Sequence, residues 1–266
     1  MKYDYHIHTS NSFDSQASIN DIALQAINIG LIEIAITDHI DFSYPNKEII
    51  SPLGLKAGIE IINTARQKYN GKLNILCGME LSLRNDIIKE ANNLVNNNEL
   101  DFIIGSTHDI NGIDFSSTTH YTNVPKKQAY ARYFENMLTT ISQIKTYDVL
   151  GHLDYVQRYG KYEDKSLNYE EYKEIIDKIL LVLIQNGKGI EINTSGYRYN
   201  CGVPHPCKEI VQRYNSLGGE IITIGSDAHV PYHLANNFKE VYDMLNSLGI
   251  KYISRFSNRK PQQVKI

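Results

Sequence analysis

The chain has 266 residues, and its 27 lysines and arginines against 30 aspartates and glutamates give a formal net charge of −3. This balance gives no reason to expect a nucleic-acid or membrane partner. No apolar run approaches the ~20 residues that a membrane span requires, and no N-terminal stretch resembles a signal peptide. Three cysteines, an odd number, do not indicate a disulfide framework. We therefore expect a soluble cytoplasmic protein whose residues 1–266 form a single domain.

Short apolar runs alternate with longer amphipathic segments along the chain. The runs predicted as strands are residues 3–9, 33–39, 74–81, 102–108, 148–155, 189–195, 220–229 and 252–256. Most of these runs are rich in Ile, Val and Leu without strict alternation, which is typical of parallel strands buried on both faces. The predicted helices lie at 18–30, 55–71, 168–187, 205–219 and 238–249, and each of them ends in a glycine.

Repeated strand–helix units predict an α/β fold with a parallel sheet, and seven or eight units favour closure into a β/α barrel. A doubly wound open sheet is the structural alternative. No glycine-rich phosphate loop follows any predicted strand, which counts against that alternative.

Histidines and acidic residues gather where the predicted strands end. They are His6 and His8 on the first strand, Asp38 and His39 on the second, Glu80 on the third, His108 on the fourth, His152 on the fifth, and Asp227 and His229 on the seventh. In a β/α barrel the C-terminal strand ends open onto one face, where active sites are built. Six of the nine histidines fall on this face, so we expect these side chains to meet in space.

The spacing within each group suits metal binding. In the H-x-H of His6 and His8, residues i and i+2 of a strand point the same way, so two imidazoles can bind one ion. Asp227 and His229 repeat that spacing. Imidazoles and carboxylates are ligands of Zn, Mn and Fe. Because one ion cannot use so many groups, the pattern predicts two or three divalent ions, with Glu80 as a possible bridge.

The remaining histidines and cysteines are interpreted as ordinary structural residues. His120, His205 and His233 lie outside the strand ends. Cys201 and Cys207 form a Cys-x5-Cys pair, which is no standard zinc spacing, and Cys77 lies inside a predicted buried strand.

Six segments, taken in order, resemble the metal-binding motifs of the PHP (polymerase and histidinol phosphatase) family. These segments are HIHTSNSFDS, ITDHID, GMEL, GSTHD, GHLDYVQRYG and GSDAH, and the resemblance runs from about residue 3 to residue 256. It implies a distorted β/α barrel of seven strands with a metal cluster at the C-terminal strand ends. One of the eight predicted strands is then peripheral, and 252–256 is the strand we expect to lie outside the barrel.

The resemblance also implies three metal sites. The first would use His6, His8, Glu80 and Asp227; the second Glu80, His108 and His152; and the third Asp14, His39 and His229. Position 14 departs from those family members that have histidine there. Aspartate still binds these metals, but the metal preference of that site is left open.

Two arginines point to the histidinol-phosphatase branch of the family. Arg158 follows the fifth-strand histidine in GHLDYVQRYG, and Arg198 follows the sixth strand in EINTSGYR. Arginine offers bidentate hydrogen bonds to phosphate oxygens, so both are predicted to bind substrate. The resemblance thus implies a phosphoric monoester hydrolase of histidine biosynthesis that converts L-histidinol phosphate to L-histidinol and phosphate.

The implied mechanism is attack by metal-activated hydroxide on phosphorus, with Glu80 bridging the ions. His229 or Asp109 would supply the proton for the leaving oxygen. Asp38, Asp41 and Asp154 are candidates to orient ligand imidazoles, although Asp41 is also a candidate helix N-cap.

Three other interpretations stay open at the level of sequence. The chain could be a PHP phosphoesterase for another small ester, such as a nucleotide or sugar phosphate. It could be a metal-binding or regulatory module without activity. An amidohydrolase-like enzyme also fits H-x-H on strand one, but no predicted strand end carries the lysine that such enzymes usually need. The loop 110–125 is either a cover for the site or an ordinary surface loop, and the sequence does not indicate an oligomeric state.

Overall fold

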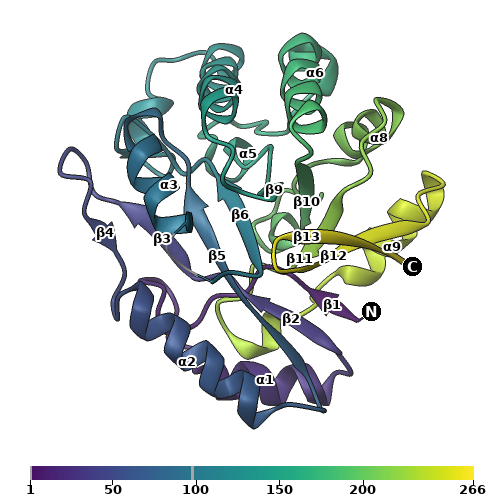
Figure 1. The fold of residues 1–266 in the computed structure, drawn as a ribbon. Helices are drawn as coiled ribbons and strands as arrows, with labels where there is room; N and C mark the ends of the chain where they lie inside the picture. The colour runs from purple at the N-terminus through teal and green to yellow at the C-terminus, as the bar shows by residue number, and fades with distance from the viewer. Residues whose placement is uncertain (1, 97–98) are drawn as a thin grey trace.

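A parallel sheet occupies the centre of the computed structural model, which describes residues 2–96 and 99–266; residues 1, 97 and 98 of the expected domain lie outside that description. The strand order is β1-β2-β5-β6-β9-β10-β11 (Figure 1). The bounds are β1 (Tyr3–Asp4), β2 (Glu33–Ile36), β5 (Asn74–Ser82), β6 (Phe102–Ser106), β9 (Val149–Leu150), β10 (Gly189–Asn193) and β11 (Ile222–Gly225).

Backbone contacts between the first and last strands bring the sheet round into a nearly closed barrel. The Tyr5 amide donates to the Ile224 carbonyl at 3.0 Å, and the His8 amide donates to the Ala228 carbonyl at 2.9 Å. Ile7 also forms a parallel bridge with Ala228. These contacts confirm the predicted distorted seven-stranded barrel and are incompatible with an open doubly wound sheet.

Helices cover the outside of the barrel (Figure 1). Five of them match the predicted segments: α1 (Ile19–Asn28), α2 (Leu55–Lys68), α6 (Tyr169–Gln185), α8 (Lys208–Ser216) and α9 (Phe238–Ser247). The glycines that close four of these predicted segments have positive φ, between 66° and 79°, the conformation that favours glycine after a helix. Two further helices, α3 (Ile88–Asn96) and α4 (Lys126–Gln143), were not predicted.

Short elements lie at the end of the barrel where the parallel strands end. β3 (His39–Phe42) pairs in parallel with β5 and antiparallel with β4 (Ile49–Ile50). β7 (Asp109–Ile110) and β8 (Ile113–Asp114) form a second hairpin, which is followed by the 3-10 turn η2 (Thr118–His120). The segment 110–125 is therefore partly an ordered hairpin. α5 (Val156–Tyr159) and α7 (Ser195–Arg198) are single turns that follow β9 and β10.

The C-terminal strands form a hairpin outside the barrel, as expected for 252–256. β12 (Tyr252–Ser257) pairs antiparallel with β13 (Lys260–Lys265). The Phe256 ring belongs to a small buried cluster with Tyr5 and Phe102, and the centres of the Phe256 and Phe102 rings lie 4.9 Å apart. Phe102 is the first residue of β6, so the hairpin packs near the strand starts, away from the end where the predicted ligands lie.

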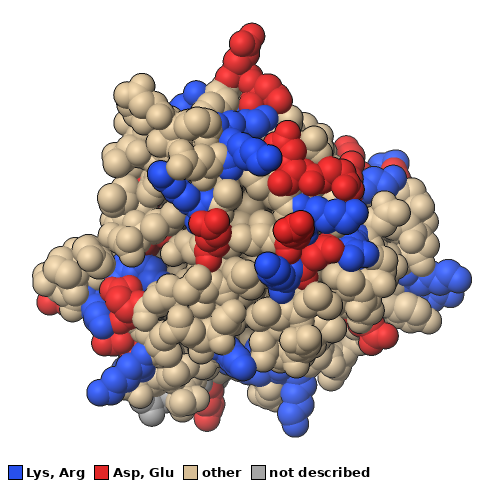
Figure 2. Space-filling model, turned by 90° about the horizontal axis from the view of Figure 1, so that it is seen from above, with Lys and Arg blue, Asp and Glu red and all other residues tan. Residues whose placement is uncertain are grey.

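The surface in Figure 2 carries lysine and arginine interspersed with aspartate and glutamate, and the described part of that face has no continuous basic surface. None of the described helices combines the length and the apolar character that crossing a bilayer requires.

Candidate metal centre

The nine predicted ligands come from six of the barrel's strand regions and converge on one end of it. His6 and His8 follow β1, Asp14 lies in the next loop, His39 begins β3, Glu80 lies near the end of β5, and His108, His152, Asp227 and His229 follow β6, β9 and β11. The strands are shorter than predicted. Six of these residues therefore lie beyond the ends of their strands instead of within them: His6, His8, His108, His152, Asp227 and His229. The second predicted strand is also broken before His39.

The first predicted site has the spacing of a four-ligand cation site. Glu80 Oε2 lies 3.2 Å from His6 Nε2 and 3.5 Å from His8 Nε2. Asp227 Oδ1 lies 3.8 Å and 3.4 Å from the same two nitrogens. A tetrahedral zinc ion with bonds of about 2.1 Å separates its ligand atoms by roughly 3.4 Å. His6 Nε2, His8 Nε2 and Glu80 Oε2 are buried without hydrogen-bond partners among the described residues, so the donor set fits a bound cation.

The second predicted site uses the other oxygen of the Glu80 carboxylate. Glu80 Oε1 lies 3.1 Å from His108 Nε2 and 2.9 Å from His152 Nε2. The Ser106 hydroxyl also donates to this oxygen, at 2.6 Å. The two oxygens of one carboxylate therefore face two different sets of imidazoles, which is the arrangement that a bridging ligand requires.

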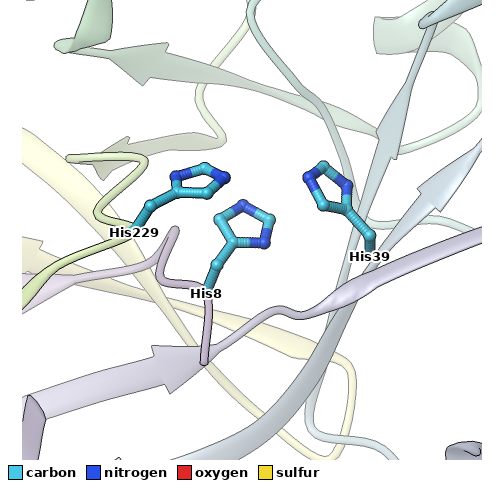
Figure 3. Close-up of side chains that lie close together, drawn as sticks. All are labelled: His8, His39 and His229. Carbon is cyan, nitrogen blue, oxygen red and sulfur yellow. The ribbon is translucent and has the colours of Figure 1, made fainter. Parts of the chain in front are cut away.

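The third predicted site lies at the outer edge of the cluster. Asp14 Oδ2 lies 3.0 Å from His229 Nε2 and 3.5 Å from His39 Nε2. The His8 ring stacks between the other two imidazoles, with ring centres 4.2 Å from each (Figure 3). The His39 ring also turns its Nδ1 toward Glu80 Oε2 at 3.0 Å. His39 thus contacts the bridging carboxylate as well as the third site, a link that the sequence did not predict.

The charges within the cluster compensate one another. Burial favours a neutral Glu80, but the surrounding imidazoles, led by His6 and His108, hold its pKa well below the usual range. Burial lowers the pKa of His6, yet neighbouring carboxylates, led by Glu191, raise it well above its ordinary value. Burial and nearby imidazoles lower the pKa of His8 and keep it in the neutral form that binds metals. Carboxylates balanced by protonated imidazoles form a site that a divalent cation can occupy by displacing protons.

Glu191 of β10 orients this cluster and was missed by the sequence analysis. Its Oε1 lies 2.6 Å from His6 Nδ1, and its Oε2 accepts a hydrogen bond from the His152 amide at 2.9 Å. A carboxylate on Nδ1 fixes the imidazole tautomer that leaves Nε2 free to bind a metal. A Cβ atom at Gly225 would lie 2.3 Å from Glu191 Oε1, so the glycine of GSDAH makes room for this contact. The one available signal was a single acidic residue within the apolar run 189–195.

The Glu191→Gln variant is expected to bind divalent metal about 10- to 100-fold more weakly, because the amide supports the His6 imidazole less well than the carboxylate does. Competition with a chromophoric chelator measures this affinity. Glu174→Gln, a change at an exposed position on α6, serves as the matched control. Equal affinity in the two variants would mean that Glu191 has only a packing role.

The other candidate orienting residues behave differently from one another. Asp41 lies in β3, not at a helix N-cap, and its Oδ1 is 3.5 Å from His108 Nδ1. The Asp38 carboxylate contacts no ligand side chain directly. It accepts a hydrogen bond from Ser12, whose hydroxyl lies 3.0 Å from His8 Nδ1.

The three histidines and the cysteines that were set aside as structural lie outside the cluster. Asp154 pairs with His205 at 2.6 Å, and this buried pair does not contact a predicted ligand in the described contacts. His120 Nε2 lies 2.9 Å from the Ile113 carbonyl, and His233 ends a 3-10 turn. Cys77 and Cys207 are buried as free thiols.

Two predicted ligands have backbone conformations that few residues adopt. His152 has φ 21° and Asp227 has φ 54°. Such conformations occur where the surrounding structure enforces them, and they are frequent at functional sites. In both cases the side chain turns back toward Glu80 or His8, in agreement with a position set by ligand geometry.

Arg158 and Arg198 border the cluster in different ways. The Arg158 guanidinium stacks 3.3 Å from the centre of the Tyr199 ring, and its Nη1 lies 3.7 Å from Asp227 Oδ2. Its buried Nε has no hydrogen-bond partner among the described residues. Arg198 donates to the carbonyls of Ser226 and Asp227, at 2.7 and 2.8 Å. Arg158 thus has an unused donor beside the cluster, whereas Arg198 also anchors the turn that carries Asp227.

Comparison with known proteins places these features in a family. The model of the PHP domain family matches residues 4–195. The chain is 34% identical to a protein named "Probable histidinol-phosphatase" from Clostridium acetobutylicum, over 94% of this chain and 95% of that one. It is 30% identical to a protein named histidinol-phosphatase from Lactococcus lactis, over 97% and 96% of the two chains.

A solved structure is similar over the whole fold. The crystal structure of histidinol phosphate phosphatase from Lactococcus lactis, in complex with Zn, L-histidinol and phosphate, superposes with a TM-score of 0.91. It is 29% identical, and the match covers 98% of each chain. The family model covers more than half of the chain, and two relatives at 30% identity or more match almost all of it, so the chain belongs to the PHP domain family.

Proposed function

We propose that this protein is a metal-dependent histidinol-phosphatase, a phosphoric monoester hydrolase that converts L-histidinol phosphate to L-histidinol and phosphate. The observation that carries this proposal is the Glu80 carboxylate, whose two oxygens face two sets of imidazoles beside the unpaired donor of Arg158. Relatives that carry the histidinol-phosphatase name at 30 and 34% identity over almost the full chain support the choice of substrate.

The proposed cofactors are two to three divalent ions of Zn, Mn or Fe. His6, His8, Glu80 and Asp227 would hold one ion, Glu80 with His108 and His152 a second, and Asp14, His39 and His229 a third. Zinc in the similar Lactococcus structure supports this class of metal. Bound there, the ions would supply Lewis-acid chemistry, which means charge neutralisation at the phosphate and activation of water.

The protein's own groups would position the ester and move protons. Arg158 and Arg198 would bind equatorial phosphate oxygens and balance the charge that develops as water attacks phosphorus and the bond to the histidinol oxygen breaks. Guanidinium donors suit this task because their geometry matches phosphate.

The leaving oxygen needs a proton, and we propose His229 as its source when two ions are bound. Hydrogen bonding to Asp14 and the charge of Asp227 raise the pKa of His229 against the effect of burial. The other candidate, Asp109, accepts the Gly112 amide at 2.8 Å and lies 3.7 Å from the Arg84 guanidinium, contacts that favour its ionised form. Burial nevertheless raises the pKa of Asp109.

The Arg198→Ala variant is expected to lower kcat/KM for the phosphate ester by about 100-fold, because one charged phosphate contact is lost. Metal content should stay at the wild-type level, since Arg198 donates to the backbone carbonyls of Ser226 and Asp227 and not to the Asp227 carboxylate. Steady-state kinetics and elemental analysis of one sample test both statements. Loss of metal would show that Arg198 acts through the Asp227 turn instead of through the substrate.

The experiment that tests the proposed function is phosphate release from L-histidinol phosphate against a panel of nucleotide and sugar phosphates, with metal analysis of the same sample. We expect a preference of about 100-fold or more in kcat/KM, roughly 2.7 kcal/mol of discrimination in the transition state. A flat profile would support the alternative of a PHP phosphoesterase for another small ester. No activity after reconstitution with metal would support a non-catalytic module.

Histidine biosynthesis in the cytoplasm is the proposed setting, with residues 1–266 acting as one PHP-type domain. One large hydrophobic core, which includes residues from Ile7 to Ile253, supports the single domain. Free thiols at Cys77, Cys201 and Cys207 agree with a reducing compartment.

A further inference from the structure

A cavity of about 270 Å³ lies between the start of α6 and the segment that links α7 to α8. Its lining includes Gln157 of α5, the α6 N-cap Asn168, and two cysteines, Cys201 and Cys207. No predicted metal ligand belongs to its described lining. The cavity is therefore separate from the metal cluster, and its volume suits a small reagent better than a large cofactor.

A buried carboxylate–imidazole pair lies next to the cysteines. Asp154 Oδ1 is 2.6 Å from His205 Nδ1, and both side chains are fully buried. The other oxygen of the carboxylate accepts the Cys207 amide at 2.9 Å. The His205 backbone exchanges two hydrogen bonds with Asn193 at the end of β10, at 2.7 and 2.8 Å. The imidazole is thus held in one orientation, in which Nδ1 contacts the carboxylate and Nε2 points elsewhere.

The Nε2 atom of His205 faces the turn against which Cys201 lies. This nitrogen is buried without a hydrogen-bond partner among the described residues. A Cβ atom at Gly196 of α7 would lie 3.1 Å from it and 2.1 Å from the Val203 carbonyl oxygen, so a glycine is needed there. The Cys201 amide donates to the Gly196 carbonyl at 2.9 Å. Cys201 and the unpartnered nitrogen therefore lie against the same residue of α7.

The electrostatic environment favours a protonated His205. Burial lowers the pKa of His205, but the charge and hydrogen bond of Asp154, together with the Cys201 side chain, raise it to about 9. A protonated imidazole next to a cysteine favours the thiolate, which is the nucleophilic form of the side chain. Cys201 is partly exposed, whereas Cys77 and Cys207 are buried, and burial raises the pKa of both buried thiols. Exposure and charge thus distinguish Cys201 from the other two cysteines.

Gln157 offers a second unpartnered donor in the cavity. Its Oε1 accepts the Leu167 amide at 2.7 Å, which fixes the orientation of the side-chain amide. Its buried Nε2 has no hydrogen-bond partner in the described part of the chain. A buried donor without a partner is costly, so an oxygen atom that enters the cavity next to the thiol would find a favourable contact.

We infer that Cys201 is a modification site, at which a hydroperoxide such as hydrogen peroxide oxidises the thiolate to a sulfenic acid. The sulfur attacks one oxygen of the peroxide, and the S–O bond forms as the O–O bond breaks. The sulfur gives up two electrons and keeps the attacked hydroxyl group. The other oxygen departs as hydroxide, takes the Nε2 proton of His205 and leaves as water. Gln157 Nε2 donates to the oxygen that is bound to sulfur.

Oxidation acts on the proposed phosphate site through Tyr199. Cys201 Sγ lies 3.8 Å from the Tyr199 carbonyl oxygen, so an oxygen added to the sulfur crowds and repels that carbonyl. The Tyr199 ring in turn lies 3.3 Å from the Arg158 guanidinium. We expect the oxidised protein to hold this arginine less well and to keep its metal. The effect on turnover rests on the proposed function, whereas the reactivity of the thiol does not.

Oxidation rates at the three cysteines test the site. Zinc-loaded protein, chosen because zinc has no redox chemistry of its own, is treated with hydrogen peroxide and dimedone, which labels sulfenic acids for mass spectrometry. Cys201 should react about 10-fold faster than N-acetylcysteine at the same pH, and Cys77 and Cys207 more slowly than it. His205→Gln should lower the Cys201 rate by about 10-fold or more. His120→Gln, at a partly exposed histidine of η2, is the matched control and should leave that rate unchanged.

Turnover of L-histidinol phosphate by the same samples tests the coupling. Peroxide should lower kcat/KM of the wild-type protein by about 10-fold, and excess glutathione should restore it, because thiols reverse sulfenic acid formation. Cys201→Ser should have the wild-type kcat/KM before treatment and keep it afterwards. Elemental analysis should find the same zinc content in treated and untreated protein.

The outcomes separate the site, its coupling and the proposed function. A Cys201 rate no higher than that of N-acetylcysteine overturns the site, whether or not His205→Gln folds. An unchanged rate in folded His205→Gln overturns the role of the imidazole. Oxidation at Cys201 without loss of kcat/KM overturns the coupling and leaves the proposed function standing. Absence of activity on L-histidinol phosphate before treatment overturns the proposed function, and the labelling rates then decide the site by themselves.

Discussion

Replacement of Glu80 by alanine is expected to abolish phosphatase activity and to lower metal content in the same sample. Glu80 contributes one oxygen to each of two predicted sites, with nitrogens of His6 and His152 at 3.2 and 2.9 Å. Without it, neither site keeps its shared anionic ligand, and the neighbouring imidazoles lose their counter-charge. We expect kcat/KM to fall by about 10⁴-fold or more, because both positioning and water activation depend on the bound ions.

Kinetics with elemental analysis before and after dialysis measure both effects of the Glu80 substitution. Glu60→Ala, which removes an exposed carboxylate from α2, is the matched control and should keep full activity and metal. Glu80→Gln retains the side-chain volume and one oxygen atom. This variant should therefore keep the fold but bind only a small part of the wild-type metal. Near-normal turnover with full metal occupancy in Glu80→Ala would disprove the cluster with a shared carboxylate.

The position of the cluster was predictable from sequence because its residues mark strand ends. His6 and His8 share a direction through their i, i+2 spacing, and both imidazoles do face the Asp227 carboxylate. Strand lengths were less predictable. β9 has only two residues because the chain turns at His152, whose φ of 21° cannot continue a strand. A backbone conformation that positions a metal ligand cannot be recognised from the residue type at that position.

Helix α4 shows where local patterns mislead. Its 18 residues bury Tyr130, Tyr133, Phe134, Met137 and Ile141 on one face, which is a helical spacing. Aromatic and β-branched residues favour strands by propensity, and no glycine closes the segment as one closes the predicted helices. Packing against α6 and the core outweighs that local preference.

Glu191 illustrates a second limit, which concerns partners distant in sequence. Its contact with His6 joins residues 185 positions apart. His6 follows β1 and Glu191 lies in β10, at opposite ends of the strand order, so they meet only because the barrel closes through β11. Spacing within a motif cannot show such a pair. The sequence gives only an acidic residue in an apolar strand, and burial of a charge requires a partner somewhere.

Arg158→Ala is expected to lower kcat/KM for L-histidinol phosphate by about 10²- to 10³-fold, the effect of removing one preorganised donor from a developing oxyanion. The guanidinium is stacked on Tyr199, and the Arg158 side chain is 13% exposed. This side chain therefore loses little conformational freedom when phosphate binds. Arg158→Lys should recover only part of the loss, because an ammonium group cannot bind two oxygens in one plane. Arg213→Ala, which breaks a surface pair with Asp177, controls for loss of a positive charge.

Metal content decides whether Arg158 acts on the substrate or on the cluster. Its Nη1 is 3.7 Å from Asp227 Oδ2, which is too long for a strong hydrogen bond, so Arg158→Ala should keep wild-type metal. The inhibition constant of inorganic phosphate should rise together with the loss in kcat/KM, because the same donor binds product and transition state. Lost metal with an unchanged phosphate constant would instead make Arg158 a support for Asp227. Arg198, which already donates to the carbonyls of Ser226 and Asp227, would then be the remaining arginine proposed to bind phosphate.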